Sequence, residues 1–286
     1  MTNILLTGAT GQVGRRLLPR LVQWADGGAV RVLVRDAAAL ADAARAGVEV
    51  LTGDLRNPED RARAVAGVDT VINSAAAFRG VPAAEMTAVN RDAAVALGEQ
   101  AAAAGARRFV QLSTNLVYPD GLGRPAEESD PAAPSEAFGP YPATKAAAEH
   151  GLRELSAVRA GELELTVLRL AFVYGEGDSH LRDFAPRLAD WAAHRRLPMV
   201  HHADIAQAVR RALSTPAAAG RTYNVADDAP VTAYQIRELL GLVQSTEASD
   251  AGDPWSGQAG TARIRAELGW RPLYPSVWTA LDAGAL

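Results

Sequence analysis

The first seventeen residues, MTNILLTGATGQVGRRL, constrain the fold of this chain more than any other stretch. Residues 3–7 form an apolar run of the size expected for a buried parallel strand, and a helical pattern begins at Gln12. Between them Gly8, Gly11 and Gly14 follow at three-residue steps. Glycine permits positive φ and a close ligand, and a helix N-terminus presents free N–H groups to an anion. The stretch predicts a strand–turn–helix unit with a pyrophosphate site. Because the spacing is not the standard GxGxxG, a glycine turn that binds nothing is the alternative.

Apolar runs and helical patterns alternate through the first 170 residues. Because each expected strand is followed by an expected helix, the pattern predicts right-handed βαβ units, a parallel sheet and helices on both of its faces. The predicted fold class is therefore α/β, a doubly wound parallel sheet of the Rossmann type. Strands are expected at residues 3–7, 30–34, 48–51, 68–73, 109–112 and 163–170, and helices from residue 12 to about 21 and at 37–46, 58–65, 83–104 and 140–159.

The pattern loosens after residue 170. We predict a dinucleotide-binding domain over residues 1–170 and a smaller substrate-binding lobe over 171–286, partly interleaved with the first. Residues 241–260 are polar and are expected to form a mobile connection. In this second part, helices are expected near 181–195, 204–214, 232–242, 262–268 and 277–281, with a strand at 222–225.

Composition argues against several partners and chemistries. The net charge is −4 and no run of Lys and Arg occurs, so nucleic acid and anionic membranes are not expected partners. No stretch approaches the ~18 uninterrupted apolar residues of a membrane span. The first apolar run has no basic segment before it and ends at Gly8, so we interpret it as a strand and not a signal peptide. The absence of cysteine excludes disulfides and cysteine–zinc sites. A cytoplasmic protein without a metal is the simplest expectation.

Polar residues at the ends of the second and third strands indicate how a dinucleotide would be bound. In a doubly wound sheet, the residue that ends the second strand meets the adenosine ribose. Arg35 stands there, and a guanidinium suits the 2′-phosphate of NADP, whereas an acid would suit NAD. Asp36 follows, so a solvated Arg–Asp pair is the alternative. Asp54 and Leu55 end the third strand and could meet the adenine, or Asp54 could cap the next helix.

A Tyr–Lys pair is the main catalytic candidate. Tyr141 and Lys145 are four residues apart in a predicted helix and share one of its faces. A lysine cation beside a phenol lowers the phenol pKa, which equips Tyr141 for proton transfer near neutral pH. Ser113 and Thr114 end the fifth strand, where a hydroxyl could hold a substrate oxygen or only satisfy a turn.

These pieces belong to a collinear series that extends over essentially the whole chain. Its members are TGATGQVG (7–14), GDL (53–55), NSAA (73–76), Asn90, STNLVY (113–118), YPATK (141–145), LRLAFVYG (168–175), HHADIAQAV (201–209), YNVAD (223–227) and LGWRP (268–272). In this series the chain resembles the extended short-chain dehydrogenase/reductase family, which holds nucleotide-sugar epimerases, dehydratases and ketoreductases.

The resemblance implies a role for each matching residue. Thr114 would hydrogen-bond the reacting oxygen, Tyr141 would be the general acid/base, and Lys145 would bind the nicotinamide ribose and depress the Tyr pKa. His201 and Asp204 match a motif that we interpret as structural, and two ligands alone make a poor metal site. The implied cofactor-binding residues are Gly8, Thr10, Gly11, Gln12, Val13, Arg35, Asp54, Leu55, Ala75, Ala76, Tyr141 and Lys145.

Departures from the family pattern indicate the reaction. The 4,6-dehydratases carry Asp-Glu directly after the catalytic Thr, where this chain has Asn115 and Leu116. Epimerases that use a cysteine acid are excluded because the chain has no cysteine. Since Arg35 favours NADPH, a reductant, we expect an NADPH-dependent ketoreductase with Tyr141 as proton donor. NAD/NADH is the second choice of cofactor. The alternative functions are a nucleotide-sugar 4-ketoreductase or 4-epimerase and a non-catalytic NADP-sensing regulator.

The expected partner is a small-molecule ketone. The segment between residues 175 and 201 is shorter than in nucleotide-sugar members, which suits a smaller or flatter ketone, such as a polyketide intermediate in an antibiotic pathway. The alanine-rich helices at 83–104 and 140–159 could form a homodimer or could pack inside. The candidate substrate residues are Phe78, Asn115, Tyr118, Phe172 and His180.

Overall fold

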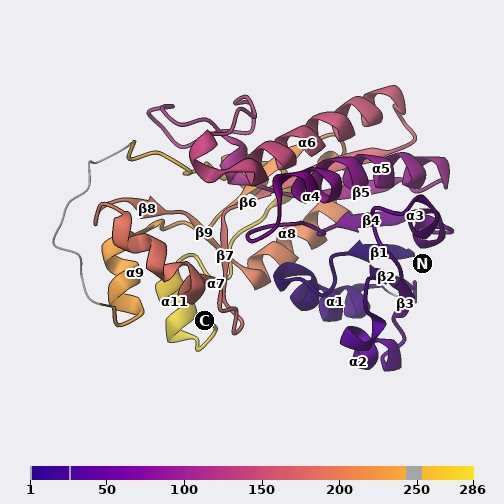
Figure 1. Ribbon diagram of the computed structural model, residues 1–286, viewed down its shortest axis with the longest axis horizontal. Helices are drawn as coiled ribbons and strands as arrows, with labels where there is room; N and C mark the ends of the chain where they lie inside the picture. Colours follow the sequence, from indigo (N-terminus) through magenta and orange to yellow (C-terminus); the bar gives the residue numbers. More distant parts are fainter. Residues whose placement is uncertain (1, 26, 243–252) are drawn as a thin grey trace. The chain divides into compact units, whose positions relative to one another are not determined.

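The computed structural model describes residues 2–25, 27–242 and 253–286 (Figure 1). Its central sheet is built from β1 (Ile4–Thr7), β2 (Val30–Val34), β3 (Glu49–Thr52), β4 (Thr70–Asn73), β5 (Arg108–Thr114), β6 (Glu164–Leu170) and β10 (Thr222–Val225), in the order β10-β6-β5-β4-β1-β2-β3. The pairs β1–β2, β1–β4, β2–β3 and β4–β5 are all parallel. The predicted doubly wound α/β fold is confirmed, and its strand order reverses at β1, where such sheets bind their ligands.

Helices and four short strands complete the described chain. The helices are α1 (Gln12–Trp24), α2 (Ala41–Arg45), α3 (Pro58–Val65), α4 (Ala83–Thr87), α5 (Ala94–Ala103), α6 (Pro140–Val158), α7 (His180–Phe184), α8 (His202–Ser214), α9 (Ala233–Leu239), α10 (Ala262–Leu268) and α11 (Val277–Asp282). The short strands are β7 (Phe172–Tyr174), β8 (Arg196–Leu197), β9 (Met199–His201) and β11 (Val231–Thr232). Within the described residues, no helix combines the length and the apolar character that a bilayer crossing requires.

The chain forms two compact units, and it passes between them several times. The first unit contains Met1–Ser113, Glu136–Leu168 and Ala212–Thr222, and the second contains Thr114–Ser135, Arg169–Arg211 and Tyr223–Leu286. The predicted domain boundary at residue 170 stays a prediction.

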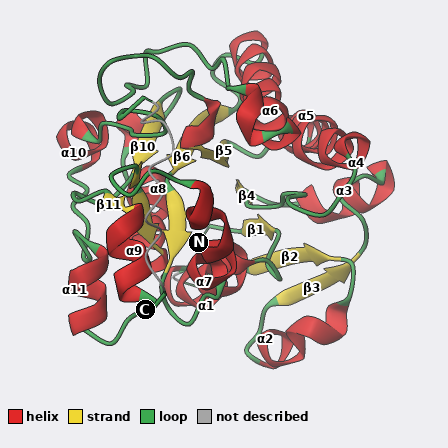
Figure 2. Cartoon of the chain, turned by 60° about the vertical axis from the view of Figure 1, so that its left-hand side comes forward, coloured by secondary structure: helices red, strands yellow, loops and turns green. Residues whose placement is uncertain are grey.

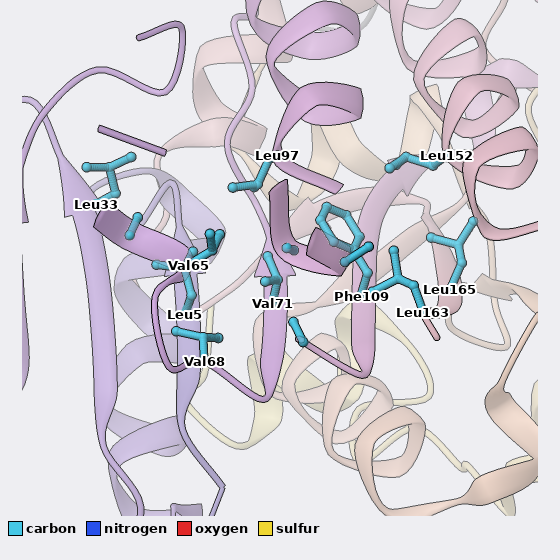
Figure 3. Close-up of a cluster of buried hydrophobic side chains, with 14 of the residues drawn as sticks. Leu5, Leu33, Val65, Val68, Val71, Leu97, Phe109, Leu152, Leu163 and Leu165 are labelled. Carbon is cyan, nitrogen blue, oxygen red and sulfur yellow. The ribbon is translucent and has the colours of Figure 1, made fainter. Parts of the chain in front are cut away.

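The core of the first unit forms where strand residues meet α3, α5 and α6. Leu5, Val71 and Phe109 extend from three parallel strands toward Leu97 of α5 and Leu152 of α6, and all five side chains are almost fully buried (Figure 3). Burying a side chain of this size contributes about 1.5–3 kcal/mol. Figures 1 and 2 both show α1 on the opposite side of these strands from α5, so helices cover both faces of this part of the sheet.

The second unit has a separate core, which gathers Tyr174, Leu188, Met199, Ile236 and Val277. Around this core β7 pairs in parallel with β9, and β8 pairs antiparallel with β11. These four strands were not predicted, because strands of two or three residues carry no periodic pattern.

Two expected helices differ from the prediction. The helix expected at 83–104 is interrupted by a π-helical segment, Ala88–Ala93, which holds the buried side chain of Asn90. Such segments often mark functional sites. The helix expected at 181–195 is replaced by α7 and a 3₁₀ segment, Ala185–Asp190, with a proline in its first turn. Of the polar connection expected at 241–260, residues 243–252 lie outside the described residues.

A buried carboxylate in the second unit should make the stability of the protein depend on pH. Asp227 is 6% exposed, and no described side chain forms a hydrogen bond with either of its oxygens. Burial raises the pKa of Asp227 to about 8, although the neighbouring backbone N–H of Ala229 acts in the opposite direction. From about pH 4 to about pH 8 the folded protein therefore keeps a proton that the unfolded chain releases.

Because of this proton, the free energy of unfolding is expected to fall as the pH rises through that window, by up to about 1.4 kcal/mol per pH unit. Asp227→Asn, which cannot ionise, should flatten the dependence and be more stable than wild type at pH 8. Urea denaturation at pH 5 and pH 8 measures both effects, with exposed Asp282→Asn as the matched control. A wild-type stability that rises between the two pH values would contradict this account.

Candidate active site

The turn between β1 and α1 has the geometry of an anion cradle. Gly8 has φ +69°, and a Cβ at this position would lie 2.6 Å from the backbone nitrogen of Ala75. A Cβ at Gly14 would lie 2.1 Å from the carbonyl oxygen of Gly8. Gly11 caps α1 and offers no side chain to the first N–H groups of the helix. These N–H groups and the positive end of the helix dipole suit an anion, so the residues present fit the pyrophosphate of a dinucleotide.

The other residues predicted around this turn lie in the same unit. Thr10 and Gln12 are exposed and Val13 is half-buried at the start of α1, and Ala75 and Ala76 follow β4. A chain of buried hydrogen bonds beside them joins the ends of β1 and β4 to the middle of β5. The Thr7 hydroxyl donates to Asn73 Oδ1 over 2.5 Å, and Asn73 Nδ2 donates to Gln111 Oε1 over 2.8 Å. These bonds hold the strand ends that support the turn.

Arg35 and its neighbours form the predicted adenosine end of the site. Arg35 follows β2, is exposed, and forms no ion pair with any described residue. Asp36 instead caps a short 3₁₀ helix, because its Oδ1 accepts a 2.9 Å bond from the N–H of Ala38. An exposed guanidinium at this strand end is available to a phosphate.

Asp54, which was predicted to lie at the adenine, forms an ion pair with Arg56, a residue that the sequence analysis did not identify. Arg56 donates to both carboxylate oxygens of Asp54, at 2.6–3.1 Å. The hydrogen bond from Arg56 lowers the pKa of Asp54 to about 2, and the charge of Arg35 acts in the same direction. Leu55, the other residue predicted at the adenine, is half-buried beside them. The sequence feature that could have identified Arg56 is its position two residues after Asp54.

Tyr141 lies at the start of α6, on the same helix face as Lys145. The ring of Tyr141 packs on that of Phe78, with centroids 4.5 Å apart, and Lys145 is 2% exposed. Burial raises the pKa of Tyr141 to about 12 and lowers that of Lys145 to about 8. The direction for Tyr141 is opposite to the one expected from a neighbouring lysine, because the burial of the phenol dominates.

Buried Asn90 ties the first turn of α6 to the segment after β4. Its Oδ1 accepts from the N–H of Ala77 over 2.7 Å, and its Nδ2 donates to Thr144 Oγ1 over 3.0 Å. The Thr144 hydroxyl in turn donates to the carbonyl of Tyr141 over 2.7 Å. Asn90 therefore positions the backbone that carries Tyr141. In the sequence, Asn90 matched the family pattern, but no function could be assigned to it.

Ser113 has an internal partner. Its hydroxyl donates to Glu149 Oε1 over 2.5 Å, which is neither of the two roles considered for this residue from the sequence. Glu149 is fully buried and was missed by sequence reasoning. The available signal was an acid four residues after Lys145, on the same helix face as Tyr141 and Lys145.

Three predicted residues stand at the end of β5 or directly after it, in the second unit. Thr114 Oγ1 accepts from the N–H of Leu116 over 3.2 Å, and Asn115 Nδ2 donates to the carbonyl of Gly257 over 2.5 Å. Tyr118 is 5% exposed, its hydroxyl donates to Asn224 Oδ1 over 2.7 Å, and the Arg169 guanidinium lies 4.6 Å from its ring centroid. Burial raises the pKa of Tyr118 to about 12. The side chains of Asn115 and Tyr118 thus have structural partners inside their own unit.

The structure brings two of the predicted substrate residues together in the second unit. The rings of Phe172 and His180 stack with centroids 4.0 Å apart and an interplanar angle of 14°. His180 Nδ1 lies 3.0 Å from the carbonyl oxygen of Val173, which fixes the imidazole on the Phe172 ring. Both side chains are half-buried, and the Phe172 ring also packs on that of Phe184 with centroids 5.1 Å apart.

His201 and Asp204 both bond to the backbone of the second unit. His201 Nε2 lies 2.8 Å from the carbonyl oxygen of Ala285, and the Asp204 carboxylate accepts from the N–H groups of Leu273 and Tyr274. These contacts agree with the structural interpretation of the motif. In the part of the chain that the structure describes, no group of three or more His, Cys, Asp or Glu side chains could hold a metal ion.

Comparison with known proteins gives a consistent set of relatives. The model of the NAD dependent epimerase/dehydratase family matches residues 4–226. Over 94% of its length the chain is 31% identical to 4-hydroxy-2-methyl-3-oxo-4-farnesyl-3,4-dihydroquinoline-1-oxide ketoreductase of Stigmatella aurantiaca, of which it covers 81%. It is also 32% identical to ceramide reductase of Caulobacter vibrioides, with 88% of this chain and 67% of that protein covered.

Solved structures share the fold over nearly the whole chain. A short-chain dehydrogenase/reductase superfamily protein of Agrobacterium tumefaciens with bound NAD has a TM-score of 0.80 and 25% identity, covering 98% of this chain and 95% of that chain. DesIV, a dTDP-glucose 4,6-dehydratase from Streptomyces venezuelae with NAD and TYD bound, has a TM-score of 0.79 and 24% identity, covering 99% and 95%. The likeness to DesIV concerns the fold alone.

Proposed function

Since the chain belongs to the NAD dependent epimerase/dehydratase family and is an enzyme of that superfamily, we propose that it is an NADPH-dependent ketoreductase. The observation that carries the proposal is the Tyr141–Lys145 pair on one face of α6, in a chain 31% identical to a ketoreductase over 94% of its length. A non-catalytic NADP-sensing regulator would not need this pair.

Each part of the reaction has a proposed residue. The cofactor, when bound, supplies hydride to the carbonyl carbon. Tyr141 donates the proton to the carbonyl oxygen, and the Lys145 ammonium stabilises the phenolate that Tyr141 becomes. Thr114 holds the same oxygen through its hydroxyl. Gly8 lets the pyrophosphate approach the backbone, as do Gly11 and Gly14, and Arg35 takes the 2′-phosphate.

The proposed substrate is a flat, largely apolar ketone of a biosynthetic pathway, such as an antibiotic-type polyketide. In the first unit the ring of Phe78 lies beside Tyr141 and is 38% exposed, and in the second unit the half-buried rings of Phe172 and His180 stack on each other. Aromatic side chains of this kind bind conjugated rings by offset stacking. The name of the Stigmatella relative states a 3-oxo-dihydroquinoline oxide that carries a farnesyl group, which is a bicyclic ketone with a large apolar substituent.

The second candidate is a nucleotide-sugar 4-ketoreductase or 4-epimerase, since several solved structures with this fold are nucleotide-sugar enzymes. A substrate panel separates the two. With NADPH and the purified protein, we expect fused-ring aromatic ketones to gain two hydrogens, as measured by mass spectrometry. Turnover of dTDP- or UDP-linked 4-keto sugars alone would move the assignment to the second candidate.

Cofactor preference is the property that Arg35 is predicted to set. We expect NADPH to bind at least tenfold more tightly than NADH, with the difference removed in Arg35→Ala, because one charge-assisted phosphate contact contributes about 1.5–3 kcal/mol. NADH affinity should not change in this variant. Titration by nicotinamide fluorescence measures both constants, and Arg45→Ala, an exposed arginine on α2, is the control. Preference for NADH by the wild-type protein would rule out this role of Arg35.

A further inference from the structure

Lys145 is the only lysine in the 286-residue sequence, and arginine fills every other position of permanent positive charge. The two residues differ chemically in one respect that matters here. An arginine stays charged in any protein environment, whereas a buried lysine readily changes its pKa. A chain that uses arginine everywhere else therefore keeps lysine at the one place where a titratable cation is useful.

Glu149 is the acid that stands one helical turn beyond Lys145, on the same face of α6. Its side chain has no exposed surface. Ser113 at the end of β5 donates to Oε1 over 2.5 Å, and Arg153 donates to Oε2 over 2.7 Å. Arg153 also donates to Thr222 Oγ1 over 3.1 Å, which fixes the guanidinium. A carboxylate without solvent costs several kcal/mol unless it is paired in this way.

The charge of Glu149 acts on Lys145. Burial lowers the pKa of the Lys145 ammonium to about 8, and the charge of Glu149 raises it, against the effect of burial. The helical segments that pack against α6 carry the charged residues Glu85, Arg91, Asp92, Glu99 and Glu136, and β5, which contacts α6 through Ser113, carries Arg108. Among the described residues, Glu149 is the one whose charge shifts the pKa of Lys145.

We propose that Glu149 is a positioning residue: a buried counter-charge, held by Ser113 and Arg153, that keeps Lys145 protonated at physiological pH. Through Lys145 it sets the upper pH limit at which Tyr141 works as a proton donor. The effect on Lys145 follows from the first unit alone, and the effect on catalysis rests on the proposed reductase function.

The single lysine makes a direct test possible. In protein labelled with carbon-13 at the lysine Cε, one resonance reports the protonation of Lys145 without cofactor or ketone. We expect a wild-type midpoint of about 8 and a midpoint lower by at least about one pH unit in Glu149→Gln, a tenfold change in the protonation constant. Glu154→Gln is the matched control, because Glu154 lies on the same helix with 67% of its side chain exposed, and its midpoint should equal that of wild type.

A folded Glu149→Gln protein that titrates within about 0.3 pH units of wild type would overturn the proposal. If this variant does not fold, Glu149→Met, an uncharged side chain of similar length, takes its place in the titration. A midpoint below that of wild type supports the counter-charge, and a midpoint equal to or above wild type refutes it. Circular dichroism of each variant establishes that it is folded.

The pH dependence of kcat is a second measurement, and it distinguishes the role of Glu149 from the proposed reductase function. The alkaline limb of the kcat–pH profile should move to lower pH in Glu149→Gln by the same amount as the Lys145 midpoint, with activity recovered near pH 6. Loss of activity by the same factor at every pH would show a merely structural role. If no ketone is reduced at all, the reductase function fails while the titration of Lys145 still decides the role of Glu149.

Discussion

Tyr141→Phe is expected to lower kcat for ketone reduction by about 10²–10⁴, the range that a positioned general acid contributes. Phenylalanine keeps the ring that packs on Phe78 and removes only the hydroxyl, so the fold and the cofactor affinity should not change. Because a proton donor is lost, the decrease should appear in kcat and not in KM. Single-turnover reduction with saturating NADPH measures the chemical step directly.

The matched control is Tyr118→Phe, which removes the hydroxyl that donates to Asn224 inside the second unit. Loss of this buried bond should reduce stability by about 1 kcal/mol and leave the chemical step within a few-fold of wild type. Near wild-type turnover by Tyr141→Phe would show that another group supplies the proton.

Gly8→Ala is expected to destabilise the protein by about 3 kcal/mol and to weaken dinucleotide binding at least tenfold. Gly8 has φ +69°, which costs an L-residue about 1–2 kcal/mol. The new Cβ would also meet the backbone of Ser74 and Ala75 at 2.6–2.7 Å, so the turn must shift, as in an overpacked core. The shifted turn would no longer present its N–H groups to the pyrophosphate.

Gly47→Ala separates the two contributions. Gly47 has φ +89°, and no described atom lies within 4 Å of a Cβ at this position. This variant carries the conformational cost without the clash, so we expect a loss of about 1–2 kcal/mol and unchanged dinucleotide affinity. Urea denaturation and NADPH titration of both variants measure the difference. Equal effects of the two substitutions on affinity would mean that the close approach of Gly8 to Ala75 is not needed for binding.

Local sequence patterns determined the architecture of the sheet and its helices. The apolar run at 3–7 and the glycines after it lie within a few residues of each other, and their meaning depends only on backbone chemistry and the period of apolar side chains. The same holds for Tyr141 and Lys145, because helical geometry alone places residues four apart on one face. Short strands such as β8 were not predicted, because two residues are too few to show an alternation of apolar and polar side chains.

The tertiary structure decided which polar side chains have partners inside the protein. Ser113 and Glu149 are separated by 36 residues, and Asn90 and Thr144 by 54. No local pattern encodes such pairs, because they form only when packed elements bring distant residues into contact. The direction of the Tyr141 pKa shift changed for the same reason: the sequence supplied the neighbouring lysine, whereas the burial that dominates the shift arises from packing. The sequence by itself thus determined the fold class and the spacing of Tyr141, Lys145 and Glu149 on one helix face, and packing determined the burial of Lys145 and the contacts that hold Glu149.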